Sequence, residues 1–389
     1  MAFWNTIVEF FQQSGIAGFF ADGGWKNLIM IVLALILLYL AIRRDFEPYL
    51  LLPISFGMLL INLPGAANEL FVTTPLTDGT YAYSGLLGYL YYGVKLGIYP
   101  CLIFLCIGAT TDFGPLISNK KTMLLGAAAQ LGIFITFIGA ILLKFTPQQA
   151  SAIGIIGGAD GPTAILVTTT LAPELLSSIS IAAYSYMALV PVIQPPIIKL
   201  LTTKKERLIR MDENVRPVSK RERIMFPIIV TIVVILIVPS CAPLIGCLML
   251  GNLIKESGVV PNITHTLSNG LLYTVTILLG VCVGATATAE NFLTVQTIEI
   301  FALGIFAFAT ATAGGILGGK LMCLATKGKV NPMIGAAGVS AVPMAARVVH
   351  KVGQEEDPEN FLLMHAMGPN VAGVIGSAVA AGVLLLLFK

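Results

Sequence analysis

Apolar segments about as long as a membrane span recur along the whole chain, and polar residues gather between them. A helix needs about 20 predominantly apolar residues to cross a bilayer. The apolar segments cover residues 27–42, 47–63, 84–110, 122–143, 174–201, 224–238, 240–256, 267–286, 298–325 and 360–388. Gly and Pro interrupt two further segments, 147–170 and 331–350. The pattern therefore predicts a polytopic, all-α membrane protein.

Basic residues orient these segments. The loop 202–223 holds eight of the 23 Lys and Arg residues, and the positive-inside rule makes it cytoplasmic. Arg43 and Arg44 should share that side, whereas 64–83 has no Lys or Arg and should lie outside. If successive apolar segments cross the membrane in alternate directions, each of the two interrupted segments must enter and leave on the same side. We therefore predict that both are re-entrant hairpins. We expect about ten transmembrane helices and two hairpins.

The sequence also repeats itself. CIGAT at 106–110 returns as CVGAT at 282–286, and GIIGGADGPTA at 154–164 shares its spacing of Gly, Pro and Ala with GAAGVSAVPMA at 335–345. Pro53 and Asn62 likewise return as Pro243 and Asn252. The orientation gives the two halves opposite topology, and inverted repeats with paired broken helices are typical of secondary transporters.

These patterns predict an inverted repeat of two five-segment units, each with one broken re-entrant hairpin. Residues 1–45 should hold an interfacial helix and a first transmembrane helix. Repeat 1 should cover 46–201 with its hairpin at 147–170, and repeat 2 should cover 239–389 with its hairpin at 331–350. The cytoplasmic loop and a linking helix, 202–238, should join them.

The composition and the short motifs argue against several classes of protein. Only 11% of the residues are charged, less than half the share in a soluble domain, and the net charge of +3 is too small to suggest nucleic-acid binding. The six Cys lie in or beside apolar segments without a CxxC pair, so neither a disulfide framework nor a zinc site is expected. There is no Walker A motif or Ser-His-Asp arrangement. The energy for transport must come from another gradient or a partner.

Asp160, in the GGADGPT stretch of the first hairpin, is the main candidate for chemistry. An ionised carboxylate within a membrane is costly unless it is paired. No Lys or Arg lies between Lys144 and Lys199, so a bound cation is the expected partner. Asp160 could also cap the helix that starts at Pro162, and the two roles are compatible.

The second hairpin offers neutral oxygens instead. Asn331, Ser340 and the carbonyls near Gly335 suit a monovalent cation better than Ca²⁺ or Mg²⁺, which collect more carboxylates. Asn331 could instead cap a helix, and Ser340 could be a small packing residue. Gln194 and Asn370 lie beside helix breaks, where an amide could bind an ion or bond freed backbone groups.

For four other residues the sequence suggests a place or a role. Tyr184 and Tyr186 should face the same interior region, and Tyr186 could bind an ion, relay a proton or simply pack. Asp112 is expected to cap a helix end. Arg347 could obey the positive-inside rule or bind an anionic group, because Arg pairs bidentately with carboxylates.

Four long motifs resemble one known family. They are GIIGGADGPTAI at 154–165, AAYSYMALVPVIQPPI at 182–197, NPMIGAAGVSAVPMAARV at 331–348 and MHAMGPNVAGVIGSA at 364–378. In these the chain is similar to the β subunit of the Na⁺-translocating, biotin-dependent decarboxylases, which act on oxaloacetate, methylmalonyl-CoA, glutaconyl-CoA or malonate. The segment 64–83 is much shorter than in the oxaloacetate type, which favours an acyl-CoA-type relative.

The resemblance implies a multi-pass subunit in the bacterial inner membrane that decarboxylates carboxybiotin and exports Na⁺, consuming a proton. It implies catalytic roles for Asp160, Tyr186 and Arg347, with Arg347 holding the carboxybiotin carboxylate. The implied Na⁺ ligands are Asp160, Asn331, Gly335, Ser340 and Asn370.

The resemblance also implies partners. These are a carboxyltransferase α subunit, a biotin carrier subunit and a small membrane γ or δ subunit, in a complex that holds several copies of this chain. The inverted repeat alone fits a different reading equally well, a Na⁺-coupled secondary transporter of a small anion. A purely structural membrane anchor would have no need of a buried Asp in a broken core.

Overall fold

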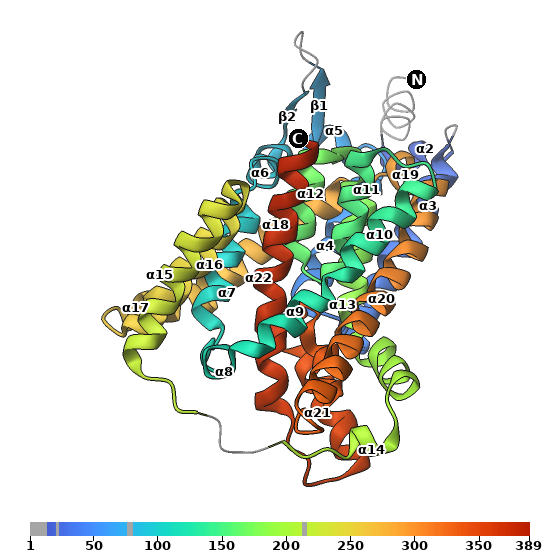
Figure 1. Ribbon diagram of the computed structural model, residues 1–389. Coiled ribbons are helices and arrows are strands. Elements are labelled where there is room, and N and C mark those ends of the chain that lie inside the picture. The colour runs from blue at the N-terminus through green and yellow to red at the C-terminus, as the bar shows by residue number, and fades with distance from the viewer. Residues whose placement is uncertain (1–13, 21–22, 76–80, 212–215) are drawn as a thin grey trace, which may run out of the picture.

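A computed structural model describes residues 14–20, 23–75, 81–211 and 216–389. The interfacial helix expected near the N-terminus lies mostly outside these residues. The described part is an assembly of helices with one small β-hairpin (Figure 1). Strands β1 (Val72–Pro75) and β2 (Tyr81–Ser84) pair antiparallel within the segment expected to lie outside.

The helices follow the predicted apolar segments closely. Before the basic loop they are α3 (Gly24–Arg43), α4 (Pro48–Asn62), α6 (Leu86–Lys95), α7 (Ile98–Thr110), α9 (Met123–Ala129), α10 (Leu131–Leu142) and α13 (Leu176–Leu201). Afterwards come α15 (Lys220–Ile237), α16 (Ala242–Ser257), α17 (Pro261–Thr266), α18 (Leu272–Ala285), α20 (Val295–Ala325) and α22 (Leu363–Phe388). Short helices α2 (Gly15–Gly18), α5 (Ala67–Leu70), α8 (Gly114–Ser118), α14 (Lys204–Arg207) and α19 (Ala289–Phe292) lie between them.

Six helical stretches of the described chain are long and apolar enough to cross a membrane, and the bent pair α6 and α7 makes a seventh. The structure thus confirms a polytopic helical membrane protein, while the count of ten crossings stays a prediction. The expected single segment 84–110 is two helices that meet at 64°. Gly97 lies between them with φ of 71°, a left-handed conformation that glycine adopts easily and that ends the first helix.

Both interrupted segments are broken as predicted, but in different ways. The first consists of α11 (Pro147–Gly154), the 3₁₀ turn η2 (Ile155–Gly158) and α12 (Gly161–Leu171). The second begins with the 3₁₀ helix η6 (Pro332–Gly338) and continues through a bend and a turn into α21 (Met344–Glu356). Both breaks lie in buried protein, where irregular backbone is tolerated at membrane depth.

The helix with the Pro and Asn positions of each repeat packs against the helix with the CIGAT or CVGAT string of the other repeat. Helix α4 packs on α18 of the other repeat, and α16 packs on α7. The Asn62 amide donates to the Ala287 carbonyl at 2.8 Å, just after the CVGAT string. The Asn252 amide lies 3.4 Å from the carbonyls of Gly108 and Thr111, at the end of the CIGAT string. In both helix pairs, one helix comes from the first half of the chain and the other from the second half.

Close backbone contacts accompany these pairs. A Cβ atom at Gly108 would overlap the Leu248 carbonyl, and one at Gly251 would overlap the Leu105 carbonyl. Small residues of this kind let membrane helices approach closely. The high glycine content thus serves the interface between α7 and α16.

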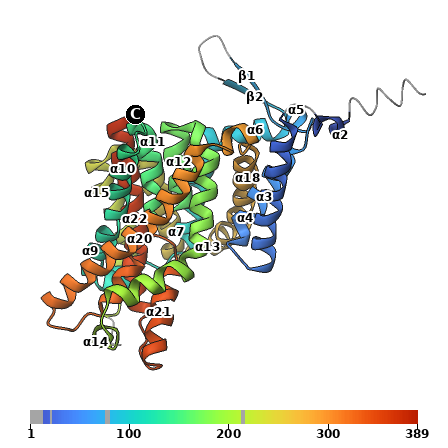
Figure 2. The same cartoon turned by 90° about the vertical axis from the view of Figure 1, so that its right-hand side faces the viewer.

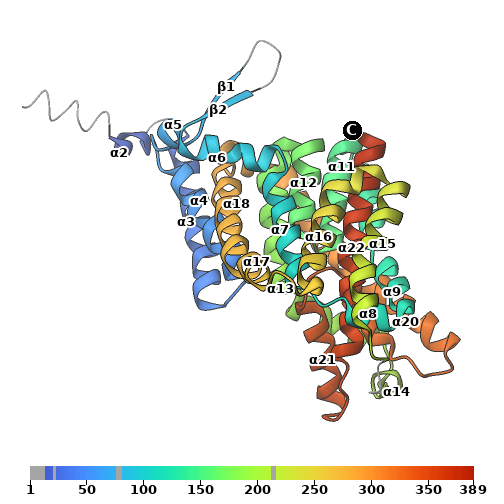
Figure 3. The same cartoon turned by 90° about the vertical axis from the view of Figure 1, so that its left-hand side faces the viewer.

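Seen from the sides, the helices form two groups. Helices α3, α4, α6 and α18 lie together along one side, and α9, α10, α20 and α22 lie along the other (Figures 2 and 3). Each group contains helices from both repeats. The segment with α14 lies at one end of the molecule, and the β-hairpin and the C-terminus lie at the opposite end (Figure 1). This arrangement agrees with a cytoplasmic position for the basic loop.

Replacing Asn62 by Ala removes the donor to the Ala287 carbonyl. We expect a loss of about 1–3 kcal/mol in the free energy of unfolding, because a buried carbonyl then stays unpaired. Thermal unfolding of the protein in detergent measures this loss as a lower midpoint. Asn252→Ala should cost less because its contacts are longer, and Asn269→Ala, at an exposed amide, is the control. Equal midpoints for Asn62→Ala and the unmodified protein would contradict the prediction.

Candidate functional site

A cavity of about 580 Å³ is lined by elements of both helix groups. Its lining residues come from α4, α7, α12, α13, α18, α22 and the break of the second hairpin. Most of the lining is apolar, with a few polar side chains that include Asp160, Ser340 and Tyr184. This size and composition are typical of a site for a small molecule. Glu47 lies at the start of α4, shortly after the basic residues Arg43 and Arg44. Asp112 lies after the end of α7, shortly before the basic residues 120 and 121. Part of the lining is therefore near the side predicted to be cytoplasmic.

Asp160 lies at the first hairpin's break and is 6% exposed. It is the N-cap of α12: one carboxylate oxygen is 3.5 Å from the Thr163 amide nitrogen, and the other accepts a 2.8 Å hydrogen bond from the Ser377 hydroxyl. Capping, one of the two expected roles, is therefore present. No Lys, Arg or His in the described part of the chain forms an ion pair with this carboxylate. Its charge would be largely uncompensated by protein.

Ser340 brings the second hairpin to the same place. Its backbone N–H donates to the Gly158 carbonyl at 3.1 Å, and both Ser340 and Asp160 line the cavity. Ala159, between Gly158 and Asp160, has a left-handed backbone with φ of 55°. The two broken hairpins thus meet directly, as the inverted repeat predicts.

Tyr184 completes this region. It is fully buried, and its hydroxyl has no hydrogen-bond partner among the described residues. Its ring lies so close to Gly161 that a Cβ atom there would overlap it. A glycine beside Asp160 therefore lets a tyrosine ring reach the same cavity.

Tyr186 is placed differently from Tyr184. Its hydroxyl donates to the Phe301 carbonyl on α20, and its ring makes edge contacts with Phe301 and Phe308. It does not appear among the residues that line the cavity. In this structure it joins α13 to α20.

Asn370 and Gln194 bond freed backbone groups of the second hairpin. The Asn370 amide donates to the carbonyls of Ala337 and Val339 at 2.9 and 2.8 Å. The Gln194 amide donates to the Ala336 carbonyl at 3.0 Å. Because these carbonyls lack helical partners, the two amides stabilise the broken backbone. Neither residue lines the cavity.

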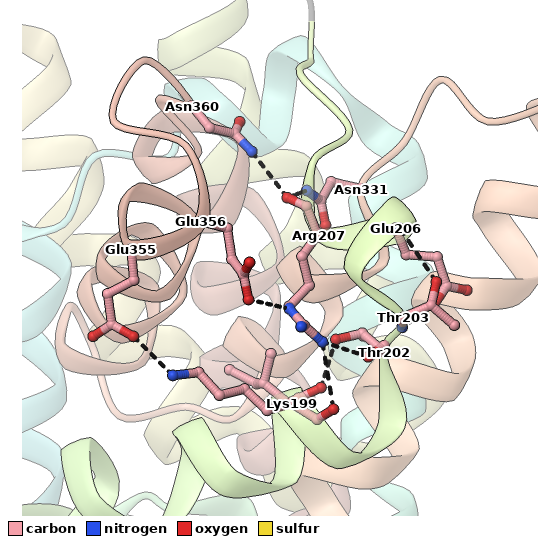
Figure 4. A network of polar contacts seen from close by, with 10 residues as sticks. Lys199, Thr202, Thr203, Glu206, Arg207, Asn331, Glu355, Glu356 and Asn360 are labelled. Carbon is pink, nitrogen blue, oxygen red and sulfur yellow. Dashed lines mark hydrogen bonds and ion pairs between the residues drawn. The ribbon is translucent and has the colours of Figure 1, made fainter.

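Asn331 caps η6 and faces the cytoplasmic end. Its side-chain oxygen accepts from the Met333 amide, and its nitrogen donates to the carbonyls of Arg207 and Ile209 (Figure 4). Gly335 packs against the Gly315 backbone of α20 with no room for a Cβ atom. Asn331 and Gly335 thus lie outside the cavity lining.

Arg347 and Asp112 lie near the ends of helices. Arg347 is exposed on α21 and forms no ion pair with a described residue. Asp112 accepts from the Gly114 amide at 2.8 Å, as a cap does, and lies 3.5 Å from Arg223.

Ser377 is a site residue that sequence reasoning missed. It lies seven residues after Asn370 on α22, so both side chains lie on one helix face. That spacing was a usable signal. Its contact with Asp160, 217 residues earlier in the chain, could not be read from the sequence.

Comparisons with known proteins give consistent matches. A family model described as the Na⁺-transporting oxaloacetate decarboxylase beta subunit matches residues 26–388. The methylmalonyl-CoA decarboxylase subunit beta of Propionigenium modestum is 57% identical and covers 99% of each chain. The glutaconyl-CoA decarboxylase subunit beta of Acidaminococcus fermentans is 54% identical over 99% of this chain and 98% of its own. The oxaloacetate decarboxylase beta chain of Klebsiella pneumoniae is 51% identical over 93% and 95%.

Removing the Ser377 hydroxyl should destabilise the folded protein, because the buried Asp160 carboxylate then loses a hydrogen-bond donor. We expect Ser377→Ala to lower the free energy of unfolding by about 1.5–3 kcal/mol, the usual worth of a hydrogen bond to a charged group. Thermal unfolding in detergent would measure it. Thr170→Ala, which removes an exposed hydroxyl on α12, should change the midpoint little. Indistinguishable midpoints for the two variants would show that Asp160 does not depend on this donor.

Proposed function

Because this chain belongs to the family of β subunits of the Na⁺-transporting, biotin-dependent decarboxylases, we propose that it is the membrane subunit of a primary Na⁺ pump. It decarboxylates carboxybiotin on a partner subunit and uses this reaction to export Na⁺. The observation that carries the proposal is Asp160, a carboxylate buried where two broken hairpins meet and without a cationic partner among the described residues. A transported cation supplies the missing charge.

The proposed Na⁺ site combines Asp160 with Ser340. Hard cations prefer oxygen ligands, and the carboxylate, the Ser340 hydroxyl and nearby carbonyls are all oxygens. The Tyr184 hydroxyl, buried and unpartnered, is a further candidate in the same cavity. Three of the predicted ligands do not contact the cation in this proposal and instead stabilise the conformation of the second hairpin: Asn331, Gly335 and Asn370.

The cavity also suits the head group of carboxybiotin. Its volume of about 580 Å³ and its largely apolar lining fit a compact bicyclic ring with one polar edge. Arg347, exposed on the helix that follows the second hairpin, would receive the carboxylate at the cytoplasmic mouth. Cleavage of the bond between the ring nitrogen and the carboxylate carbon releases CO₂. The ring nitrogen takes one proton, which accounts for the proton consumed.

Coupling requires that the chemistry depend on Na⁺ occupancy. Moving one charge against a membrane potential costs about 2.3 kcal/mol per 100 mV, so one decarboxylation can drive only a few ions. We propose alternating access, in which cation binding at Asp160 and Ser340 lets one helix group shift against the other. Tyr186 holds α13 on α20 through its hydrogen bond to the Phe301 carbonyl.

The complex has further subunits under this proposal. A carboxyltransferase α subunit loads a biotin carrier subunit, and a small membrane γ or δ subunit accompanies several copies of this chain. The higher identity to the methylmalonyl-CoA and glutaconyl-CoA relatives than to the oxaloacetate relatives supports an acyl-CoA substrate for the carboxyltransferase. The family disfavours the alternative, a Na⁺-coupled secondary transporter. Avidin-sensitive, Na⁺-stimulated CO₂ release by the assembled complex separates the two, since a plain transporter releases none.

Asp160→Asn should abolish Na⁺ uptake by inverted vesicles or proteoliposomes containing the complex, because a neutral amide cannot balance the ion's charge. Loss of at least 90% of transport, or about tenfold, corresponds to about 1.4 kcal/mol and is the smallest effect we expect. Glu174→Gln is the matched control, the same change at an exposed carboxylate after the first hairpin. Near-normal transport by Asp160→Asn would rule out this site.

A further inference from the structure

The segment 202–210, here called the clasp, follows α13 and contacts both ends of the second hairpin. It contains α14 and lies beside the start of η6, the end of α21 and the turn before α22 (Figure 4). Thr203 and Glu206 form a capping box at the start of α14, and Lys320 of α20 lies 3.4 Å from Glu206. The clasp is thus an ordered part of the cytoplasmic face.

Two asparagines from different elements share the same two carbonyls of the clasp. Asn331, before η6, donates to the carbonyls of Arg207 and Ile209 at 3.2 and 2.9 Å. Asn360, before α22, donates to the same carbonyls at 3.1 and 3.4 Å. Both asparagines are at most 1% exposed. The clasp therefore fixes the start of the second hairpin and the turn after it at one point.

The Arg207 side chain makes a second connection. Its Nε atom bonds Glu356 at the end of α21 at 2.7 Å, and both side chains are less than 20% exposed. Its Nη1 atom donates to the Thr202 carbonyl at 2.6 Å and to the Lys199 carbonyl at 3.4 Å. One guanidinium thus joins the end of α13 to the end of α21, and its fixed fork geometry suits this task better than a lysine would.

A third, outer pair supports the same turn. Arg210 binds Asp357 through two hydrogen bonds of 2.6 and 3.0 Å. These bonds hold the pKa of Asp357 below its ordinary value, so Asp357 stays ionised through the physiological pH range. Arg210 is 57% exposed, so this pair contributes less than the Arg207 pair.

These contacts tie the second hairpin at three points to the clasp and to the first hairpin. The clasp holds its start and its end, and the Gly158 carbonyl holds Ser340 in its middle. Helix α13, directly before the clasp, carries Tyr184 into the cavity. A connected set of bonds thus links Asp160 and Ser340 to α21, which carries Arg347.

We propose that the clasp is a coupling element, in which Arg207 and Asn360 are positioning residues that make decarboxylation depend on Na⁺. This inference rests on the pump function proposed above. Without the clasp the start and the end of the second hairpin lose these contacts, so Ser340 binds the cation less well and part of the carboxybiotin held by Arg347 is decarboxylated without cation transport. A role limited to folding would lower the amount of active complex but leave its Na⁺ dependence unchanged.

The test uses the complete complex with its partner subunits. We expect Asn360→Ala and Glu356→Gln each to raise the Na⁺ concentration for half-maximal CO₂ release about three- to tenfold. The ratio of Na⁺ transported to CO₂ released in proteoliposomes should fall, while the maximal rate at saturating Na⁺ stays within about twofold. Glu355→Gln is the matched control, since it breaks the neighbouring but exposed pair with Lys199 and should change none of these values.

The outcomes are distinct. If the unmodified complex shows Na⁺-stimulated CO₂ release and both variants keep its half-maximal Na⁺ concentration and transport ratio, the clasp proposal is overturned while the pump function stands. If the unmodified complex shows no such release, both proposals fail. Arg207→Lys, which keeps the charge but not the fork, supplies the same readout should Asn360→Ala fail to assemble.

Discussion

The free energy of holding a carboxylate away from bulk water governs this structure. Asp160 receives one hydroxyl and one long amide contact, and the start of α12 adds a favourable helix dipole. These partly compensate the lost hydration, but a buried carboxylate without a counter-charge remains costly. Asp160, which has no positively charged partner among the described residues, lines a cavity formed by both repeats.

Broken backbone is the second cost that the fold must offset. The two hairpins expose carbonyls that a continuous helix would use internally, and the amides of Gln194 and Asn370 satisfy three of them. Because these amides donate to the second hairpin from α13 and α22, the hairpin's shape depends on helices of both repeats. Gln194 and Asn370 therefore stabilise broken backbone, whereas Asp160 lines the cavity.

Crosswise pairing joins the two repeats at two helix interfaces. Helix α4 completes α18 and α16 completes α7, with glycines at the closest backbone contacts of the second pair. Such interfaces are tightly packed. Both broken hairpins pack on α20 and α22, and a backbone hydrogen bond from Ser340 to Gly158 joins them beside the cavity.

The sequence by itself located the long apolar helices, both broken segments and Asp160, because hydropathy and the positions of Gly and Pro are local properties. The orientation and the bounds of the repeats stay predictions from charge and motif order. The family also followed from long motifs. Only the tertiary structure decided which polar residues share the cavity. Asn331, Gln194 and Asn370 looked as suitable for an ion as Ser340, since any side-chain oxygen near a helix break has the same local signal. Ser377 reaches Asp160 across 217 residues, and such a contact exists only once the helices have packed.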